Sequence, residues 1–542
     1  MDRLRLVGKV LDLLAEGRIP AARDAAERAR QADPSAADSL LAVASFWTGD
    51  FDSAFVAATR AVGAADDEEA RALALVATAL ACSGLADRRT PDDPVTAAVD
   101  AVLACSDDTP WWALMRYLAT EAALVSARLD EAARVQGPWR HPAEVWADRP
   151  SAVLMAACWV RLAAFRGRIA DATDLLPGMH AAGAGNRLET VAEAVDCLVL
   201  GNADHPDAMA GRDRVLAALP EHPSDWVDRG VLLLLAFGAI ATGDPTAAAG
   251  LVFRAGGDEA LTRCTLIDRG LGLELLLVAA LLEEDEPAAA VWAAHLAELV
   301  DTRIVGPTAD RALSRFALAR GAVDEAIERA ERSIRHCRAQ DRVVEAAEGE
   351  IVLARARIAR HDVAAATKSL RAVVAAADGA GHVAVRRSAS ETLGAVRRRL
   401  PPVAGGGWAV LSAREAEVAR QILAGADLGS IAESLFLSPH TVRTHASRVL
   451  CAFGAPTRIG LLAVAGPGPG EASMMPPAPL SARQDQVAAL IAQGRSNAQV
   501  ATELEISVKA VEKHIGDIRV RWQATSRFDV ARLWWATRAA SP

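Results

Sequence analysis

The feature that most constrains this 542-residue chain is an internal repeat near its carboxyl end. Residues 411–464, moved forward by 69 positions, align without a gap on residues 480–533, and 15 of the 54 aligned positions are identical. Most of the other positions keep their apolar or polar character. Because self-similarity of this kind marks one structural unit used more than once, both segments are expected to adopt the same small fold.

Each copy carries the signals of a short helical module. Ser412 followed by Glu415, and Ser481 followed by Gln484, are capping boxes that start a helix. Apolar residues at helical spacing follow, and a glycine ends each helix. A short helix is then expected over 431–435 and 500–504. Ser438-Pro439 and Ser507-Val508 open a third helix, so each copy predicts a helix-turn-helix whose third helix fits a DNA major groove.

At this point the two copies resemble the LuxR/GerE-type DNA-binding domain. The resemblance rests on LSAREAEVARQILAG, IAESLFLSPHTVRTHASRVL and APTR in the first copy, and on LSARQDQVAALIAQG, VATELEISVKAVEKHI and ATSR in the second. It covers about 110 residues of the chain. It implies double-stranded DNA as a partner, and it places Arg443, Thr444 and Ser447 at base-facing positions and Thr441 and His445 at backbone-contact positions.

The third helices supply the candidate DNA-binding residues, because arginine, lysine and hydroxyl groups suit phosphates and guanine edges. They are Thr441, Arg443, Thr444, His445, Ser447 and Arg448 in the first copy and Lys509, Glu512, Lys513 and His514 in the second. Glu512 replaces a basic residue, so it either accepts a cytosine amino proton or indicates lost binding; we expect the second copy to be auxiliary. Asp427-Leu428 stands where the family has Ser-Asn, which puts that turn's phosphate contact in doubt.

The last helix of each copy, expected over 459–464 and 528–535, is apolar. In the family this helix makes dimer contacts, and pairing between two chains or between the two copies of one chain stays open. Trp534 and Trp535 are neighbours, and neighbours on a helix do not face the same side. We therefore expect this pair to contact more than its own module.

Residues 1–400 predict a body of helix after helix. Glycine turns such as Gly17, Gly49, Gly167, Gly243 and Gly321 are followed by alanine-rich amphipathic helices, a pattern similar to degenerate tetratricopeptide repeats. The expected fold is all-α, a TPR-like α-solenoid followed by two tandem modules, with a bundle lacking true repeats as the alternative. The predicted domains are 1–400, 408–465 and 480–538, with a Pro/Gly linker over 466–479.

Four tryptophans of the body invite a functional interpretation. Trp111, Trp112, Trp139 and Trp146 lie within about 35 residues of one another. They predict either an aromatic-lined ligand pocket or simple packing between helices, and packing is favoured because aromatic side chains usually serve it. Because of its helical-repeat architecture, the body is still expected to receive a small-molecule or protein signal.

The net charge of −10 is unevenly distributed. From residue 408 onward there are 14 Lys and Arg against 11 Asp and Glu, whereas the rest carries 45 against 58. An acidic body with a mildly basic end fits DNA binding confined to the modules. We therefore expect a non-enzymatic transcriptional regulator. A protein-interaction adaptor whose modules dock protein is the alternative.

Several classes of protein are disfavoured. No phosphate-binding loop, receiver-like strand pattern or nucleophile–base set stands out. The seven cysteines are scattered singly, which indicates reduced thiols, no metal site and a cytoplasmic protein. The longest apolar run, residues 231–241, is about half of a membrane span, so neither a membrane nor a cofactor is expected.

Overall fold

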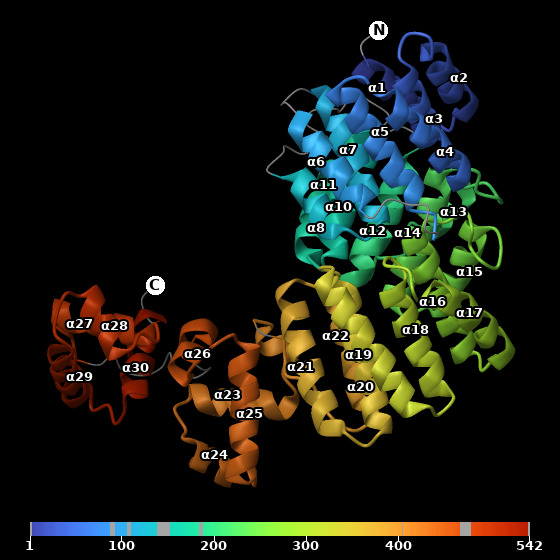
Figure 1. Ribbon diagram of the computed structural model, residues 1–542. Coiled ribbons are helices and arrows are strands. Elements are labelled where there is room, and N and C mark those ends of the chain that lie inside the picture. The colour runs from blue at the N-terminus through green and yellow to red at the C-terminus, as the bar shows by residue number, and fades with distance from the viewer. Residues whose placement is uncertain are drawn as a thin grey trace. The chain divides into compact units, whose positions relative to one another are not determined.

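The computed structural model describes residues 3–86, 93–105, 110–137, 152–183, 188–403, 405–466 and 478–539 (Figure 1). Within these residues the regular structure is helical throughout, so the predicted all-α class is confirmed. The chain divides into two compact units, residues 1–398 and 399–542. None of the described helices combines the length and hydropathy needed to cross a membrane.

The first unit is built of helices that follow one another with short connections. They are α1 (Arg3–Ala15), α2 (Ile19–Ala29), α3 (Pro34–Thr48), α4 (Phe51–Ala64), α5 (Glu68–Cys82), α6 (Pro94–Cys105), α7 (Pro110–Val125), α8 (Leu129–Gln136), α10 (Ala152–Phe165), α11 (Ile169–Gly183), α12 (Glu189–Asn202), α13 (Arg212–Ala218), α14 (Trp226–Thr242), α15 (Pro245–Gly256), α16 (Leu266–Leu282), α17 (Glu286–Leu299), α18 (Gly306–Ala319), α19 (Val323–Ala339), α20 (Val343–Ala359), α21 (Val363–Gly379) and α22 (Val383–Gly394).

Local sequence explains why these helices stop and restart where they do. The five glycines expected at turns all have positive φ, between 75° and 90°, a conformation that glycine adopts without steric cost. Aspartates then cap many of the helices that follow, each accepting a backbone N–H three residues on. Those with this geometry are Asp33, Asp50, Asp67, Asp225, Asp244, Asp285 and Asp362. The outcome is a series of stacked helix pairs, the TPR-like α-solenoid.

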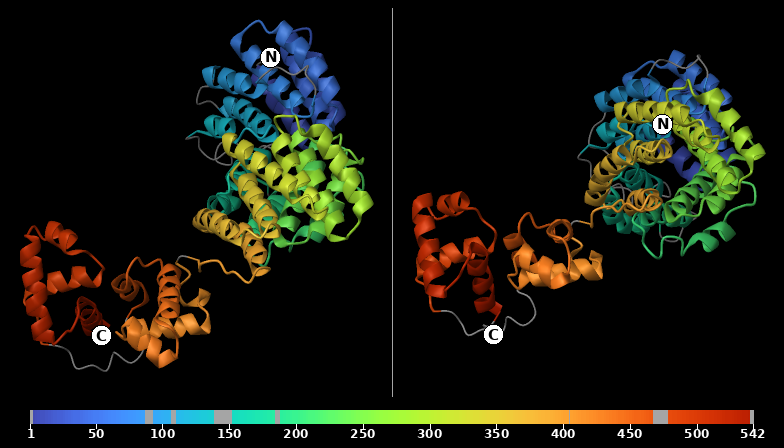
Figure 2. Two further views of the ribbon diagram at one scale, coloured as in Figure 1. Left: turned by 60° about the horizontal axis from the view of Figure 1, so that its bottom comes forward. Right: turned by 90° about the horizontal axis from the view of Figure 1, so that it is seen from below.

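The solenoid curls until helices far apart in sequence touch (Figure 2). Arg229 on α14 donates from Nη2 to the carbonyl of Trp47 at 2.8 Å, and His382 hydrogen-bonds Asn202 at 2.8 Å. Close approach is aided by glycine: a Cβ on Gly238 would lie 2.6 Å from the carbonyl oxygen of Cys197. One core cluster therefore runs from Leu6 on α1 to Leu313 on α18, and a separate cluster joins α18, α19 and α20.

A buried ionic cluster links α16, α18 and α20. Arg311 donates from Nε to Glu274 at 2.8 Å and from Nη1 to Glu345 at 3.1 Å. Arg342 donates to Glu345 at 2.6 Å. Burial opposes ionisation of Glu345, but the charges of Arg342 and Arg311 outweigh it and lower its pKa to about 2. Glu345 is thus the anion that holds two buried arginines.

Replacing that anion is expected to destabilise the body. Glu345→Gln should lower the free energy of unfolding by about 3–5 kcal/mol at neutral pH, because buried Arg342 loses its carboxylate partner and Arg311 keeps only Glu274. Since the folded-state pKa is depressed, the contribution of Glu345 is present above its usual pKa of 4.5 and is lost as the pH falls toward 2. Denaturant unfolding of wild type and variant at several pH values measures both effects.

Glu348→Gln is the matched control on the same helix. The Glu348 side chain is 34% exposed, and its ion pair with Arg315 is longer, at 3.4 Å. It should cost less than about 1 kcal/mol. Equal losses in the two variants would contradict the role given to Glu345.

The second unit contains two four-helix modules in sequence. The first comprises α23 (Ala413–Leu423), α24 (Leu428–Leu435), α25 (Pro439–Ala452) and α26 (Arg458–Ala465), preceded by the 3₁₀ turn η1 (Gly407–Val410). The second comprises α27 (Ala482–Ala492), α28 (Asn497–Glu503), α29 (Val508–Trp522) and α30 (Arg527–Ala539). Both expected capping boxes, Ser412–Glu415 and Ser481–Gln484, are present. The short helices α24 and α28 begin three residues earlier than their apolar pattern suggested, because Asp427 and Ser496 cap them.

Candidate nucleic-acid interface

The third helix of the first module, α25, exposes one polar face. Ser438 caps it by accepting the N–H of Thr441 at 3.1 Å, and Pro439 occupies its first turn. Val442, Ala446 and Val449 are buried in the module core. Since residues three and four apart share a helix face, the face opposite these three points to solvent.

Arg443, Thr444 and Ser447 lie on that exposed face. The hydroxyl of Thr444 donates to the carbonyl of His440 at 3.1 Å. No carboxylate lies within ion-pair distance of Arg443 among the residues that the structure describes, and α25 contains no acidic residue. The exposed face therefore presents an uncompensated guanidinium and two hydroxyl groups, which is the chemistry that phosphates and guanine edges accept.

Three other predicted residues of α25 are half-buried and have partners inside the module. Arg448 Nε lies 2.5 Å from Glu415 Oε1 on α23, and His445 Nδ1 lies 3.9 Å from the same oxygen. The hydroxyl groups of Thr441 and Ser438 are 2.8 Å apart. Arg448 thus joins α25 to the capping box of α23, a role that the sequence pattern did not reveal; its contact with DNA stays a prediction.

Burial and hydrogen bonding act in opposite directions on the pKa of Glu415. Burial disfavours its charge, but hydrogen bonds from the Ser412 N–H and hydroxyl, together with the positive charge of Arg448, outweigh burial and hold its pKa below the usual value. The carboxylate is therefore ionised at neutral pH, and it needs Arg448 as a counter-charge.

The turn before α24 departs from the family pattern, and its geometry explains how. Asp427 accepts the backbone N–H groups of Gly429 at 2.8 Å and Ser430 at 3.0 Å, and it is exposed. These N–H groups, with Ser430 first, hold its pKa below the usual value. An anionic cap at this turn replaces the neutral serine cap that the second module has in Ser496, and it repels rather than attracts a phosphate.

The reading helix of the second module, α29, has a different charge pattern. Val511 and Ile518 are buried, while Lys509, Glu512 and Lys513 are exposed and His514 is half-buried. Farther along, Arg519 donates to the carbonyl of Thr525 at 2.5 Å, which ties it to the end of its own helix. The outward face of α29 therefore combines two lysines with an acid at the position equivalent to Arg443.

Equivalent arginines of the two modules donate to backbone carbonyls in the same way. Arg414 donates to the carbonyl of Leu435 at 2.6 Å, and Arg483 donates to that of Leu504 at 2.5 Å. Arg458 donates to the carbonyl of Ala426 at 2.5 Å, and Arg527 donates to that of Arg495. These arginines are identical in the two copies of the repeat, and that identity was the signal in the sequence for their role. Carbonyl groups at or just after a helix end lack a partner in the helix and need such donors.

The tryptophan pair of α30 corrects one expectation. Trp534 Nε1 donates to Asp485 at 3.2 Å, and Trp535 Nε1 donates to the carbonyl of Ala492 at 3.1 Å. Both rings therefore pack along α27 of their own module. The expectation failed because a helix that crosses another in close contact can cover it with adjacent side chains when both are as large as tryptophan.

Comparison with known proteins agrees with this geometry. Residues 409–465 and 478–534 each match the model of the family described as "Bacterial regulatory proteins, luxR family". The chain carries two LuxR-type helix-turn-helix domains. The two matched segments coincide with the four-helix modules, including the caps and arginines described above.

Two curated relatives match a short part of the chain. It is 40% identical over 72 residues to the "Probable transcriptional regulatory protein NarL" of Mycobacterium tuberculosis, in strains CDC 1551 / Oshkosh and ATCC 25618 / H37Rv. The matched segment is 13% of this chain and 32% of each relative, so the chain spans about a third of their length.

One solved structure is similar to a large part of the chain. It is titled "Crystal structure of APC/C hetero-tetramer Cut9-Hcn1", and the match covers 73% of this chain and 93% of that one at 13% identity. Its TM-score of 0.25 is too low to support an argument.

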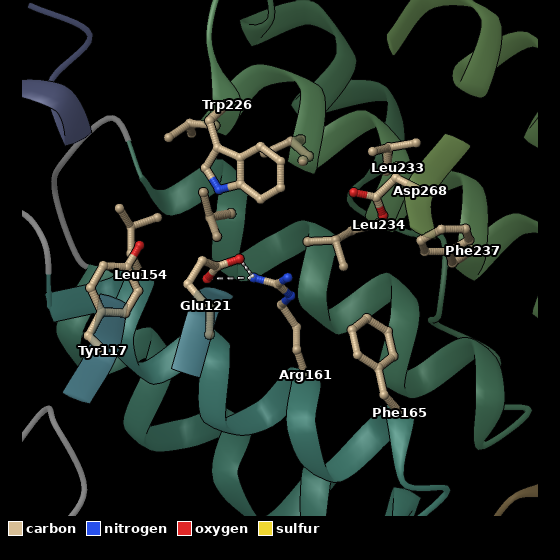
Figure 3. Close-up of a pocket in the computed structure, with 15 residues that line it drawn as sticks. Tyr117, Glu121, Leu154, Arg161, Phe165, Trp226, Leu233, Leu234, Phe237 and Asp268 are labelled. Atoms are coloured by element: carbon tan, nitrogen blue, oxygen red, sulfur yellow. Dashed lines mark hydrogen bonds and ion pairs between the residues drawn. The ribbon is translucent and has the colours of Figure 1, made fainter. Parts of the chain in front are cut away.

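A small cavity lies in the body among α7, α10, α12, α14 and α16 (Figure 3). Glu121 and Arg161 point toward each other in it at 3.0 Å, with Trp226, Tyr117 and Asp268 around them. Its volume is about 50 Å³, compared with roughly 150 Å³ for a cavity that admits benzene. The cavity therefore has room for a few water molecules, and the ion pair is an internal link between α7 and α10.

The predicted tryptophan pocket is not among the walls of this cavity. Trp112 is 4% exposed and belongs to the core of the body. Trp139, Trp146 and the side chain of Trp111 lie outside the described residues. A ligand site at these tryptophans remains a prediction. No cluster of three metal-binding side chains occurs within the part of the chain that the structure describes.

The two arginines of α25 are expected to respond differently to truncation. Arg443→Ala should change the stability of the module by less than about 0.5 kcal/mol, because Arg443 is exposed. Arg448→Ala should cost about 1–3 kcal/mol, because it leaves the buried Glu415 carboxylate without its partner. Hydrogen–deuterium exchange of peptides from α23 and α25 measures the difference, and equal protection in the two variants would contradict this assignment.

Proposed function

We propose that this chain is a DNA-binding transcriptional regulator whose first module reads promoter DNA through α25. The observation that carries the proposal is the exposed face of Arg443, Thr444 and Ser447 on a helix without acidic residues. That face is held by a LuxR-type helix-turn-helix scaffold. Basic and hydroxyl groups on such a helix bind phosphates and base edges in the major groove.

The second module is proposed to assist the first. Lys509 and Lys513 are exposed and suit phosphate contacts, while Glu512 lies between them on the reading helix. A carboxylate in the groove is favourable where it accepts a cytosine amino proton and unfavourable elsewhere. The second module would therefore add affinity at few sequences, and this would tune the choice of promoter.

The acidic body is proposed to act as the receiver of a signal. Residues 1–407 carry 45 Lys and Arg against 58 Asp and Glu, so the body repels the DNA backbone and limits non-specific binding. Stacked helix pairs present extended surfaces that bind peptides or small ligands. Binding of such a signal to the body would control the modules.

One observation favours a second candidate function, that of a protein-docking adaptor. Glu512 and the anionic cap at Asp427 each place a negative charge on a module face that normally meets phosphate. A protein-docking adaptor tolerates such charges better than a DNA reader does. The two functions differ in how they respond to Arg443→Ala, which removes a DNA contact and leaves the rest of each module intact.

The test is selection of fragmented genomic DNA by the purified full chain. A DNA reader should enrich one short motif, and Arg443→Ala should weaken binding to it by about 5- to 150-fold, corresponding to one lost bidentate contact of about 1–3 kcal/mol. Affinity should also fall steeply with salt, as phosphate contacts require.

Arg420→Ala is the matched control, because Arg420 is 48% exposed on α23 and pairs with Glu417. It should leave the motif and its affinity unchanged. Binding that is equal on all DNA, or that is reduced equally by both substitutions, would overturn the proposal and favour the adaptor.

A further inference from the structure

The fourth helices of the two modules face each other within the second unit (Figure 1). The guanidinium of Arg458, at the start of α26, lies 5.1 Å from the ring centre of Phe528 at the start of α30. Both side chains are half-buried. A cation over an aromatic face contributes about 0.5–2 kcal/mol, more when water is excluded, so the two modules share a specific contact.

The contact involves equivalent positions of the two modules. A Cβ on Gly425, at the end of α23, would lie 3.4 Å from Arg532 Nε and 3.9 Å from Asp529 Oδ1 on α30. A Cβ on Gly494, at the end of α27, would lie 3.7 Å from Gly460 Cα on α26. The 69-residue shift that relates Gly425 to Gly494 also relates Gly460 to Asp529.

Each module therefore places its turn glycine against the same position of the other module's fourth helix. Here the turn of each module meets the fourth helix of the other module. A reciprocal contact of this kind is isologous, and it generates a two-fold axis. Both glycines have positive φ, 94° and 85°, which lets the chain turn sharply at each contact, and a Cβ at either position would meet the other module at ordinary van der Waals distance.

We propose that the two modules of one chain pair through α26 and α30 and act as an intramolecular counterpart of a dimer. An approximate two-fold axis then relates α25 to α29. A single chain would occupy a DNA site made of two half-sites in inverted orientation. The DNA part of this inference rests on the proposed function, whereas the pairing of the modules does not.

The half-sites would differ in sequence, because the paired helices differ. Arg443, Thr444 and Ser447 on α25 correspond to Glu512, Lys513 and Gly516 on α29. Arginine favours guanine, while a carboxylate accepts from a base amino group, that of cytosine above all, and is repelled by the acceptors of guanine. An asymmetric site of this kind binds the paired modules in one orientation along the promoter.

The pairing is tested without DNA by a cysteine trap in the full chain. A Cβ on Gly494 would lie 3.7 Å from Gly460 Cα, so the two backbones are close enough for a disulfide, which spans about 4.4–6.8 Å between Cα atoms. Gly460→Cys with Gly494→Cys, oxidised by oxidised glutathione at low protein concentration, should form a bond within one chain. The product should migrate faster on a non-reducing gel at unchanged mass.

Gly425→Cys with Gly494→Cys is the matched control. It introduces cysteines at both turn glycines, so it carries at least the backbone strain of the first pair, but the Cβ atoms face the opposite helices and not each other. It should stay reduced. A covalent dimer of the first pair would show pairing between chains, and a folded but unlinked chain would show independent modules; either result overturns the inference.

The DNA part is tested by light scattering of the full chain on its selected site. One chain per duplex is expected, with a binding preference of at least tenfold for duplexes that carry both half-sites over duplexes with one. Phe528→Ala should reduce that preference, whereas Phe436→Ala, at a side chain that is 96% exposed, should leave it unchanged. Two chains on a symmetric site, or a direct repeat of half-sites, would contradict the inference. A chain that selects no DNA but forms the disulfide would refute the proposed function and retain the pairing.

Discussion

The geometry of both modules depends on arginines that donate to carbonyl groups at helix ends. Arg414 and Arg483 donate to Leu435 and Leu504 at the ends of α24 and α28. Arg458 and Arg527 donate to Ala426 and Arg495 in the turns that follow α23 and α27. Carbonyls in the last turn of a helix have no partner in the helix itself, and a charged donor satisfies them more strongly than a neutral one. These bonds fix the angles between helices, and so they fix where the reading helix and the fourth helix point.

Two kinds of charge arrangement follow from this scaffold. Arg448 in the first module is matched by Glu415, and buried Arg342 in the body is matched by Glu345. Outside, Arg443 is left without an acid on a helix face that the core forces toward solvent. An unmatched cation on an ordered surface is free to bind an external anion. This contrast, within a chain whose net charge is −10, is why DNA contact is assigned to the carboxyl-terminal unit.

Local signals made much of this structure predictable. The capping boxes, the glycine turns and the 69-residue repeat each depend on residues close in sequence, and they located the helices and the module fold. Pairings that depend on distant residues were not predictable: nothing in α25 reveals that Arg448 pairs with Glu415, 33 positions earlier. The packing of Trp534 and Trp535 along α27 likewise depends on a helix crossing that helical periodicity does not contain.

The central claim is that α25 reads base edges in the major groove through Arg443. Methylation interference on the selected DNA site tests it most directly, because a methyl group on guanine N7 blocks an arginine contact there. Wild-type binding should be blocked by methylation of specific guanines in one half-site, and Arg443→Ala should lose its sensitivity at one of them. Binding that ignores methylation, or an interference pattern identical in wild type and Arg443→Ala, would contradict the account.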